Sequence, residues 1–565
     1  MESPRGPSTF PLGSRRLLTG WMRSGGRAMV AQVWSVTVCG VEGIRVRVEV
    51  NVASGMPSLS VVGLPQGAVR EGRDRIQSAL RAGGWPLPPR RITVNLAPGD
   101  LKKEGAGFDL PIAVALLAAS EQIPKEGLGG HAFLGELGLD GEVRPVRGVL
   151  PAALRCRQDG LETLVVPLGN VAEAVAVGSP PQVFGVRHLA DLVDHFRGER
   201  GLVRVTAKRA QTRREAPSVD LREIRGQRTA KRALEIAAAG GHHLLLAGPP
   251  GGGKTLLARA MAGILPPLSR EEALEVTGIH SVAGLLPSGS GLLDRPPFRA
   301  PHHTVSTAGL VGGGRPPRPG EVSLAHGGVL FLDELGEFSR HALESLRQPL
   351  EEGVVSVVRV QERHIFPARF SLVAAMNPCP CGQSGGGSGG GGPPCVCDPT
   401  QVARYRNRIS GPLRDRIDLH VETSAVSLEL LTGEPDGPCS ATVLARVREA
   451  RMAQLRRFSG SSDSGASGSS NAPASHSSRD AHASVNARMG PGELRTYVPL
   501  DAAARRLLAP AMERFGLSPR AIHRVLRVAR TVADLEGVPR VEPSHLAEAL
   551  QFRTPSSVVG TGLIG

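Results

Sequence analysis

A glycine-rich segment from Gly248 to Thr255 constrains the fold of this chain more than any other feature. Its sequence, Gly-Pro-Pro-Gly-Gly-Gly-Lys-Thr, matches the pattern G-x-x-x-x-G-K-S/T between the apolar run 244–247 and a stretch with helical spacing, a setting that disfavours an incidental glycine turn. In such a loop, backbone N–H groups surround phosphate oxygens, the lysine reaches the β- and γ-phosphates, and the hydroxyl binds Mg2+. The segment therefore predicts an ATP site formed by Gly248, Pro249, Pro250, Gly251, Gly252, Gly253, Lys254 and Thr255.

Two acids and an asparagine follow further apolar runs and complete the predicted site. Asp333 and Glu334 come directly after the run 329–332, and Asn377 comes shortly after the run 371–375. Runs that are apolar on both faces are typical of parallel strands covered by helices, and such sheets place ligands at the carboxyl ends of their strands. Asp333 is therefore expected to hold Mg2+ and Glu334 to polarise the attacking water. Asn377 is expected to orient that water, its alternative role being that of a turn residue.

Composition and patterning divide the chain into several domains, because 565 residues exceed what one hydrophobic core organises. Alternating apolar residues at 44–51, followed by helix and strand patterns, predict an α/β domain near the N-terminus. Apolar faces at helical spacing after residue 490 predict an all-helical domain. No apolar run approaches the ~20 residues of a membrane span, so no membrane partner is expected. The expected segments are a disordered extension at 1–28, the α/β domain at 29–196, a linker at 197–217, the nucleotide-binding core with a cysteine insert at 218–430, a helix and a flexible Ser/Gly-rich insert at 431–490, and the helical domain at 491–555.

Four of the seven cysteines are clustered and indicate a metal site. Two C-x-C pairs separated by thirteen residues offer four thiolates, enough for tetrahedral structural Zn2+; free thiols on a glycine-rich loop are the alternative. Such a cluster is typical of a reducing compartment, so a cytoplasmic location is expected. The formal net charge of +15 favours a polyanionic partner, although an arginine-rich solvated surface accounts for it equally well. The predicted Zn2+ ligands are Cys379, Cys381, Cys395 and Cys397.

Several further motifs carry a resemblance to a known family. They are Phe298-Arg-Ala-Pro-His-His303-Thr, Asn377-Pro-Cys-Pro-Cys-Gly382, Ser410-Gly-Pro-Leu-Arg-Asp-Arg-Ile-Asp-Leu-His420 and Arg527-Val-Ala-Arg-Thr-Val-Ala-Asp-Leu535. With these motifs the chain resembles the AAA+ ATPases, specifically their magnesium-chelatase-like ComM/YifB branch, over nearly all of 29–553. His302 and His303 are interpreted as part of the branch's insert motif rather than as metal ligands.

The resemblance implies a homo-oligomer, expected to be a hexameric ring with ATP and Mg2+ at its subunit interfaces. It implies that Arg416 is an arginine finger directed at a neighbour's γ-phosphate, that Asn377 is sensor 1 and that Arg520 is sensor 2. The family usually has leucine where this chain has Arg414, so arginines stand on both sides of Asp415, and Arg416 is the preferred finger. For either arginine, the alternative is an ordinary ion pair within the subunit.

The N-terminal domain resembles the proteolytic domain of Lon through Lys103-Glu-Gly-Ala-Gly-Phe-Asp-Leu110 and Gly141-Glu-Val-Arg-Pro-Val-Arg-Gly148. A Lon-type peptidase needs a serine nucleophile activated by a lysine. The matching places fall near Ala106 and at Ala152, so a fold without peptidase activity is expected, and Ser120 is interpreted as structural. The predicted fold class is thus α/β, with a Lon-protease-like N-terminal α/β domain, a P-loop AAA+ parallel-sheet core and an all-helical C-terminal lid domain.

Two function classes remain. The first is a ComM-like motor that couples ATP hydrolysis to remodelling of branched or single-stranded DNA, by branch migration or helicase activity, without regard to base sequence. The second is a magnesium-chelatase-type ATPase subunit that drives metal insertion. The Lon-like domain and the Cys-Pro-Cys motif favour the first. Its candidate DNA contact is a hairpin-like stretch, Val354 to Phe366, with Arg359 and Arg363 near a polar tip; an ordinary solvated hairpin is the alternative.

Overall fold

The computed structural model describes residues 29–205, 219–315, 317–359, 362–383, 395–426, 428–459 and 485–553. The predicted extension at 1–28, the glycine tract at 385–394 and the segment 460–484 of the Ser/Gly-rich insert lie outside these described residues. The chain forms two compact units. Unit 1 comprises Met1–Arg213 with His280–Leu292, and unit 2 comprises Arg214–Ile279 with Leu293–Gly565.

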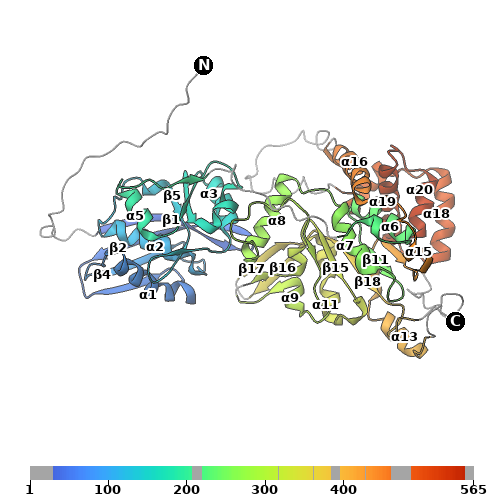
Figure 1. Cartoon of the computed structure of the whole chain (residues 1–565), viewed down its shortest axis with the longest axis horizontal. Helices are drawn as coiled ribbons and strands as arrows, with labels where there is room; N and C mark the ends of the chain where they lie inside the picture. The colour runs from blue at the N-terminus through green and yellow to red at the C-terminus, as the bar shows by residue number, and fades with distance from the viewer. Residues whose placement is uncertain are drawn as a thin grey trace, which may run out of the picture. The chain divides into compact units, whose positions relative to one another are not determined.

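Unit 1 is built on an eight-stranded mixed sheet (Figure 1), whose spatial order is β10-β9-β8-β5-β1-β2-β4-β3. The predicted strand at 44–51 lies within β2, where Val46, Val48 and Val50 are buried and alternate with more exposed polar residues. β2 pairs antiparallel with β1 and β4, and helices α2 and α3 pack on it. The strands are β1 (Met29–Cys39), β2 (Glu42–Ala53), β3 (Ser58–Val62), β4 (Arg91–Ala97), β5 (His131–Phe133), β6 (Glu136–Leu137), β7 (Val143–Arg144), β8 (Thr163–Pro167), β9 (Gln182–Val186) and β10 (Arg204–Val205).

The helices of unit 1 include α2, which is buried along its whole length. Its apolar sequence predicts such a core helix, and among the described residues no helix is both long and apolar enough to span a membrane. The Asp109 carboxylate at its start accepts hydrogen bonds from Nε and Nη2 of Arg75 on α1 at 2.7 and 3.2 Å, which offsets the cost of burying the charge. The helices are α1 (Gly67–Ala82), α2 (Asp109–Ala119), α3 (Val149–Gln158), α4 (Val171–Val175) and α5 (Leu189–Phe196).

Unit 2 is built on a five-stranded parallel sheet with the order β12-β15-β18-β11-β19. All residues of β11, β15 and β18 are buried, which confirms the three doubly apolar strands predicted from the sequence. Because these three strands are neighbours and parallel, the residues that follow them meet at one edge of the sheet. The strands of the sheet are β11 (Leu244–Ala247), β12 (Phe298–Arg299), β15 (Val329–Leu332), β18 (Ser371–Met376) and β19 (Leu419–Glu422).

Two short antiparallel hairpins accompany this sheet. One joins β13 (Gly312–Gly313) to β14 (Arg318–Pro319), and the other joins β16 (Val354–Arg359) to β17 (Glu362–Pro367). The second confirms the hairpin predicted at 354–366.

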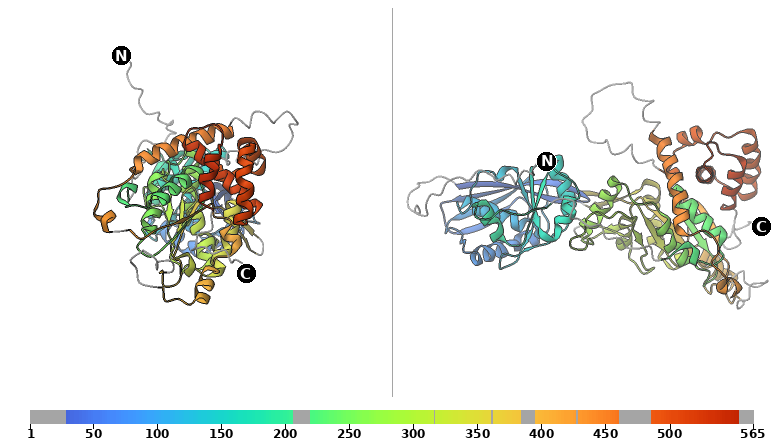
Figure 2. Two further views of the ribbon diagram at one scale, coloured as in Figure 1. Left: turned by 90° about the vertical axis from the view of Figure 1, so that its right-hand side faces the viewer. Right: turned by 45° about the horizontal axis from the view of Figure 1, so that its top comes forward.

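Helices of unit 2 surround the sheet and continue to the end of the described chain. The long helix α16 packs on α6, α7 and α19, as Figure 2 shows in orange, green and red. Helix α18 ends at Phe515 and is capped by Gly516, whose φ of 59° is the left-handed conformation typical of a helix stop. The helices are α6 (Arg228–Gly240), α7 (Lys254–Ile264), α8 (Arg270–Ala283, whose last turn belongs to unit 1), α9 (Thr307–Val311), α10 (Glu321–Leu324), α11 (Arg340–Ser345), α12 (Arg347–Glu352), α13 (Pro399–Arg406), α14 (Gly411–Arg414), α15 (Leu428–Thr432), α16 (Ser440–Ser459), α17 (Pro491–Tyr497), α18 (Ala502–Phe515), α19 (Pro519–Leu535) and α20 (Pro543–Gln551).

Candidate nucleotide site and cysteine cluster

The glycine-rich loop turns directly from β11 into α7, with Lys254 as the first helical residue. Its glycines are sterically required at two places. A Cβ on Gly248 would lie 2.3 Å from the Thr423 carbonyl oxygen, and Gly253 caps α7 with a φ of 74°, where a side chain is strained. The turn leaves the N–H groups of α7's first turn available to an anion.

Lys254 lies at the centre of the loop. Its ammonium donates hydrogen bonds to the carbonyl oxygens of Gly248 and Pro249 at 2.7 and 2.8 Å and to Oδ1 of Asn377 at 3.1 Å. The side chain is nearly buried, and burial lowers the pKa of Lys254 although the Asp333 charge opposes that shift. The structure therefore brings the predicted phosphate-binding lysine and the predicted sensor asparagine into direct contact.

The predicted Mg2+ ligands Thr255 and Asp333 are also in direct contact. The Thr255 hydroxyl donates to Oδ2 of Asp333 at 2.8 Å, and the other carboxylate oxygen accepts the Glu334 N–H at 3.0 Å. A hydroxyl and a carboxylate this close fit the shell of one Mg2+, which takes oxygen ligands and retains several waters. The residues present thus fit the Mg2+–nucleotide complex predicted from the sequence.

Glu334 has a backbone conformation that is uncommon for a non-glycine residue, with φ 51° and ψ 49°. Its carboxylate lies 3.4 Å from Nδ1 of His303, whose ring is tilted by 34° against that of His302 with the centroids 4.1 Å apart. The sequence interpretation missed this contact. It arises because β12, which precedes the histidines, pairs with β15, which precedes Glu334, and strand order is not legible in a single sequence.

The two predicted arginines lie around a different acid. Arg416 forms an ion pair with Glu351 and donates from Nη1 to the Pro412 carbonyl oxygen at 2.6 Å, and only 7% of its side chain is exposed. This ion pair with Arg416, reinforced by the charge of Arg520, holds the pKa of the Glu351 carboxyl below its ordinary value. Among the described residues, the ion pair and hydrogen bond of the Arg416 side chain involve Glu351 and Pro412 and no residue of the phosphate loop.

The four clustered cysteines converge as predicted. All four sulfur atoms lie within 4.8 Å of one another, and Sγ of Cys379 is 3.4 Å from that of Cys381 and 3.7 Å from that of Cys395. Four thiolates about 2.3 Å from one ion would be about 3.8 Å apart, so the spacing fits a tetrahedral Zn2+ site. Backbone N–H groups of Gln383 and Val396 lower the pKa of the Cys381 thiol to about 6, whereas burial and the neighbouring thiols raise the pKa of Cys397. The chemistry of this donor set fits zinc.

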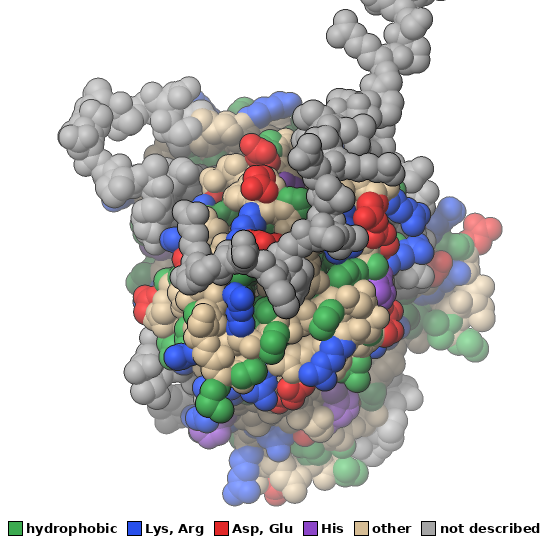
Figure 3. All heavy atoms as spheres, turned by 90° about the vertical axis from the view of Figure 1, so that its left-hand side faces the viewer, with side chains coloured by type: hydrophobic (Ala, Val, Ile, Leu, Met, Phe, Trp, Pro, Cys, Tyr) green, Lys and Arg blue, Asp and Glu red, His purple; other side chains and the backbone are tan. Residues whose placement is uncertain are grey.

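The hairpin β16–β17 carries exposed apolar and basic groups. Val358 is 72% exposed, and the exposed Arg363 donates to the Ser356 hydroxyl at 3.2 Å. The side chain of Arg359 lies outside the described residues. On the face of unit 1 that Figure 3 shows, Lys and Arg side chains are interspersed with Asp and Glu, so the net positive charge of the chain is not concentrated on that face.

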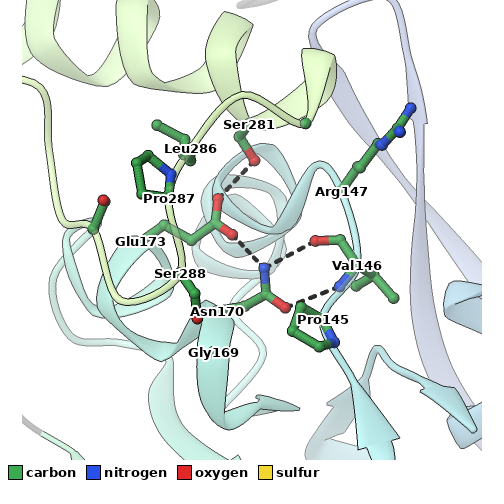
Figure 4. Close-up of a pocket in the computed structure, with 12 residues that line it drawn as sticks. Pro145, Val146, Arg147, Gly169, Asn170, Glu173, Ser281, Leu286, Pro287 and Ser288 are labelled. Carbon is green, nitrogen blue, oxygen red and sulfur yellow. Dashed lines mark hydrogen bonds between the residues drawn. The ribbon is translucent and has the colours of Figure 1, made fainter.

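Unit 1 shows no peptidase pair at the places that the Lon resemblance indicates. Ala152 is fully buried within α3, and the hydroxyl of Ser120 donates to the Leu116 carbonyl oxygen at 2.7 Å, a structural bond that caps α2. A polar cavity of about 220 Å³ lies elsewhere in the unit (Figure 4). There the buried Glu173 accepts hydrogen bonds from Ser281 and Asn170, each at 2.6 Å. Burial raises the pKa of Glu173, although its hydrogen bonds from Ser281 and Asn170 oppose that shift.

Comparisons with known proteins agree with this geometry. Family models described as magnesium chelatase subunit ChlI match residues 220–431 and 48–170, and a model of the ChlI C-terminal region matches 437–553. The chain is 41% identical to the uncharacterized protein YifB of Salmonella typhimurium, covering 93% of this chain and 97% of that protein. It is 40% identical to competence protein ComM of Haemophilus influenzae, covering 93% of this chain and 97% of that protein. The chain is also 26% identical to Lon protease of Brevibacillus choshinensis over a segment that covers 27% of this chain and 21% of that protein.

Proposed function

The chain belongs to the ComM/YifB family of magnesium-chelatase-like AAA+ ATPases, and from this premise we propose that it is a motor that uses ATP hydrolysis to remodel DNA. The expected activity is branch migration or helicase action during recombination of incoming DNA. The relative named competence protein ComM suggests this pathway.

The contact set at the carboxyl ends of β11, β15 and β18 carries the ATPase part of the proposal. Lys254 and the loop N–H groups bind and orient the phosphates, and bound Mg2+ supplies charge stabilisation at the transferring phosphoryl group. Thr255 and Asp333 would hold that ion. Glu334 accepts the proton of the attacking water, and Asn377 orients the water. Asn377 accepts a hydrogen bond from Lys254. The lysine that binds the γ-phosphate and the asparagine that orients the attacking water would therefore lie in one cluster.

The proposed ring rests on the observation that the predicted finger, Arg416, does not contact the phosphate loop among the described residues. Among the residues that the structure describes, the Arg416 side chain contacts Glu351 and Pro412 rather than the subunit's own phosphate loop, as expected if it serves a neighbour's nucleotide. Arg520, the proposed sensor 2, contributes its charge near Glu351. A homo-oligomer that closes in this way is a ring, and we propose a hexamer. The helices α17 to α20 would then act as the lid domain.

The DNA part rests on the hairpin β16–β17 and on the net charge of +15. A hairpin with Arg363 exposed offers phosphate contacts without base readout, so binding should weaken steeply with salt. The alternative is a chelatase-type ATPase that drives metal insertion, which the ChlI family models support. The identity of 40% to competence protein ComM extends over 93% of this chain, so it takes in most of the Lon-like unit as well as the ATPase core, and this supports the DNA motor.

One experiment separates these alternatives. The steady-state ATPase rate of the full chain is measured with and without a four-way DNA junction at low salt, together with strand exchange at the junction. The proposal expects stimulation and ATP-dependent exchange. ATPase-active protein that neither binds nor moves the junction would refute the DNA motor and favour the chelatase-type role.

We also propose that the cysteine cluster binds structural Zn2+ and that the protein is cytoplasmic, where thiolates stay reduced. The ion would fix the loop that follows Asn377, because Cys379 lies two residues beyond it. Zinc would thereby stabilise the position of the sensor asparagine rather than take part in hydrolysis.

A further inference from the structure

Arg416 lies in an environment that does not satisfy it fully. Its side chain is 7% exposed, and its Nε is buried without a hydrogen-bond partner among the described residues. Buried guanidinium groups normally have all their donors satisfied. The observed position therefore resembles a resting position of the side chain rather than a permanent structural bond.

The acid that holds Arg416 is partly open to solvent. Glu351 is the penultimate residue of α12 and its side chain is 45% exposed. When the pair opens, water can replace Arg416 at the half-exposed Glu351, but the nearly buried Arg416 needs another anion in its place. Glu351 can thus neutralise Arg416 and release it when a phosphate takes over its role.

The backbone at Arg416 is fixed independently of this ion pair. Nη1 of Arg524 on α19 donates to the Arg416 carbonyl oxygen at 2.8 Å and to Oδ1 of Asp418 at 2.6 Å. The Asp418 carboxylate is buried and also accepts the His243 N–H at 3.0 Å. Loss of the Glu351 contact therefore leaves the Arg416 side chain with its hydrogen bond to the Pro412 carbonyl oxygen, while its main chain stays in place.

We propose that Glu351 is a latch on Arg416. It holds the guanidinium within its own subunit and yields it to the γ-phosphate bound by a neighbouring subunit. The inference rests on the proposed function, in which Arg416 is the arginine finger. A phosphate competes successfully because it offers more negative charge and matches the planar guanidinium with two parallel hydrogen bonds. Glu351 is thus a positioning residue that sets the fraction of subunits whose finger is engaged.

The test compares Glu351→Gln and Glu351→Ala with the matched control Glu352→Gln in the full chain. Glu352 is the neighbouring exposed acid of α12, and its carboxylate accepts only a local hydrogen bond from Gln348 at 2.8 Å. Both Glu351 variants should raise the basal ATPase rate, by about fivefold at most, which corresponds to about 1 kcal/mol for a half-exposed pair. The control should leave the rate unchanged.

The same substitutions are then made in an Arg416→Ala background. If Glu351 acts through Arg416, they have no further effect there, whereas an independent structural role would add its effect. An unchanged or lowered rate in Glu351→Gln and Glu351→Ala overturns the latch, as does a rise that persists without Arg416. If Arg416→Ala itself leaves the ATPase rate intact, the finger assignment fails and the latch with it.

Discussion

The buried contact of Asp418 with Arg524 gives a prediction whose size follows from the structure. Burial raises the pKa of Asp418, but the charges of Arg524 and His242 outweigh it and hold the pKa well below its ordinary value. Asp418→Asn keeps the shape and removes the charge, which leaves Arg524 without its carboxylate. Removing one partner of a buried ion pair costs about 3–5 kcal/mol. Asp415→Asn is the matched control, because Asp415 lies in the same loop and is exposed.

The chain offers an internal reference for this measurement. The two tryptophans among the described residues, Trp34 and Trp85, belong to unit 1, so the change of their fluorescence in urea reports unit 1, whereas circular dichroism at the helix band includes the helices of unit 2. Asp418→Asn should lower the midpoint of the unit 2 transition and leave the tryptophan transition in place. A loss of free energy of unfolding below about 1 kcal/mol, or equal losses in Asp415→Asn, would refute the reasoning.

The difference in free energy of unfolding between the wild type and Asp418→Asn should change with pH in a direction that the Asp418 pKa determines. The Asp418 pKa is lower in the folded than in the unfolded chain, so ionisation stabilises the fold at pH values above the unfolded pKa of about 3.9. This contribution is lost as the pH falls toward the folded pKa. The advantage of the wild type over Asp418→Asn should therefore be constant near neutral pH and shrink below about pH 4.

The remaining predictions concern the nucleotide site, the interface and the metal. Lys254→Ala should abolish ATP binding in an equilibrium assay, and Glu334→Gln should bind ATP and hydrolyse it poorly; normal turnover in Glu334→Gln contradicts its role as base. Arg416→Ala should bind ATP and lose about 10³-fold in rate, and mixing it with Lys254→Ala subunits should restore some activity, unless the finger acts within its own subunit. Metal analysis should find about one zinc per chain, lost in Cys379→Ser and retained in Cys439→Ser; free reactivity of all the clustered thiols in folded protein excludes the site.

Those parts of the fold that depend on local sequence were predictable. The apolar strands, the buried helix α2 and the hairpin β16–β17 each follow from a run or an alternation of side chains, and each is confirmed. The convergence of Thr255 with Asp333 also follows, because parallel strands end at one edge of a sheet.

Contacts that depend on which strands and loops are neighbours were not predictable. His303 meets Glu334 only because β12 pairs with β15 in the sheet, and the intervening chain carries no sign of this order. The pairing of Arg416 with Glu351 joins residues that lie 65 positions apart, and the sequence offers many acids as alternatives. Long-range ion pairs have no periodic signature, so a single sequence leaves their partners undetermined.

The proposed DNA contact and the proposed latch are adjacent in the chain. Helix α12 ends at Glu352 and is capped by Gly353, whose φ of 67° reverses the chain, and β16 begins at the next residue. The Gly353 carbonyl oxygen accepts the Ala368 N–H at 2.8 Å, so the base of the hairpin is closed directly beside α12. Only Glu352 and Gly353 separate Glu351 from the first residue of the hairpin. A displacement of the hairpin by bound DNA would therefore move Glu351 directly. Polyanion binding and release of the finger arginine would in this way be mechanically linked within one subunit, which is the coupling that a DNA-stimulated ATPase requires.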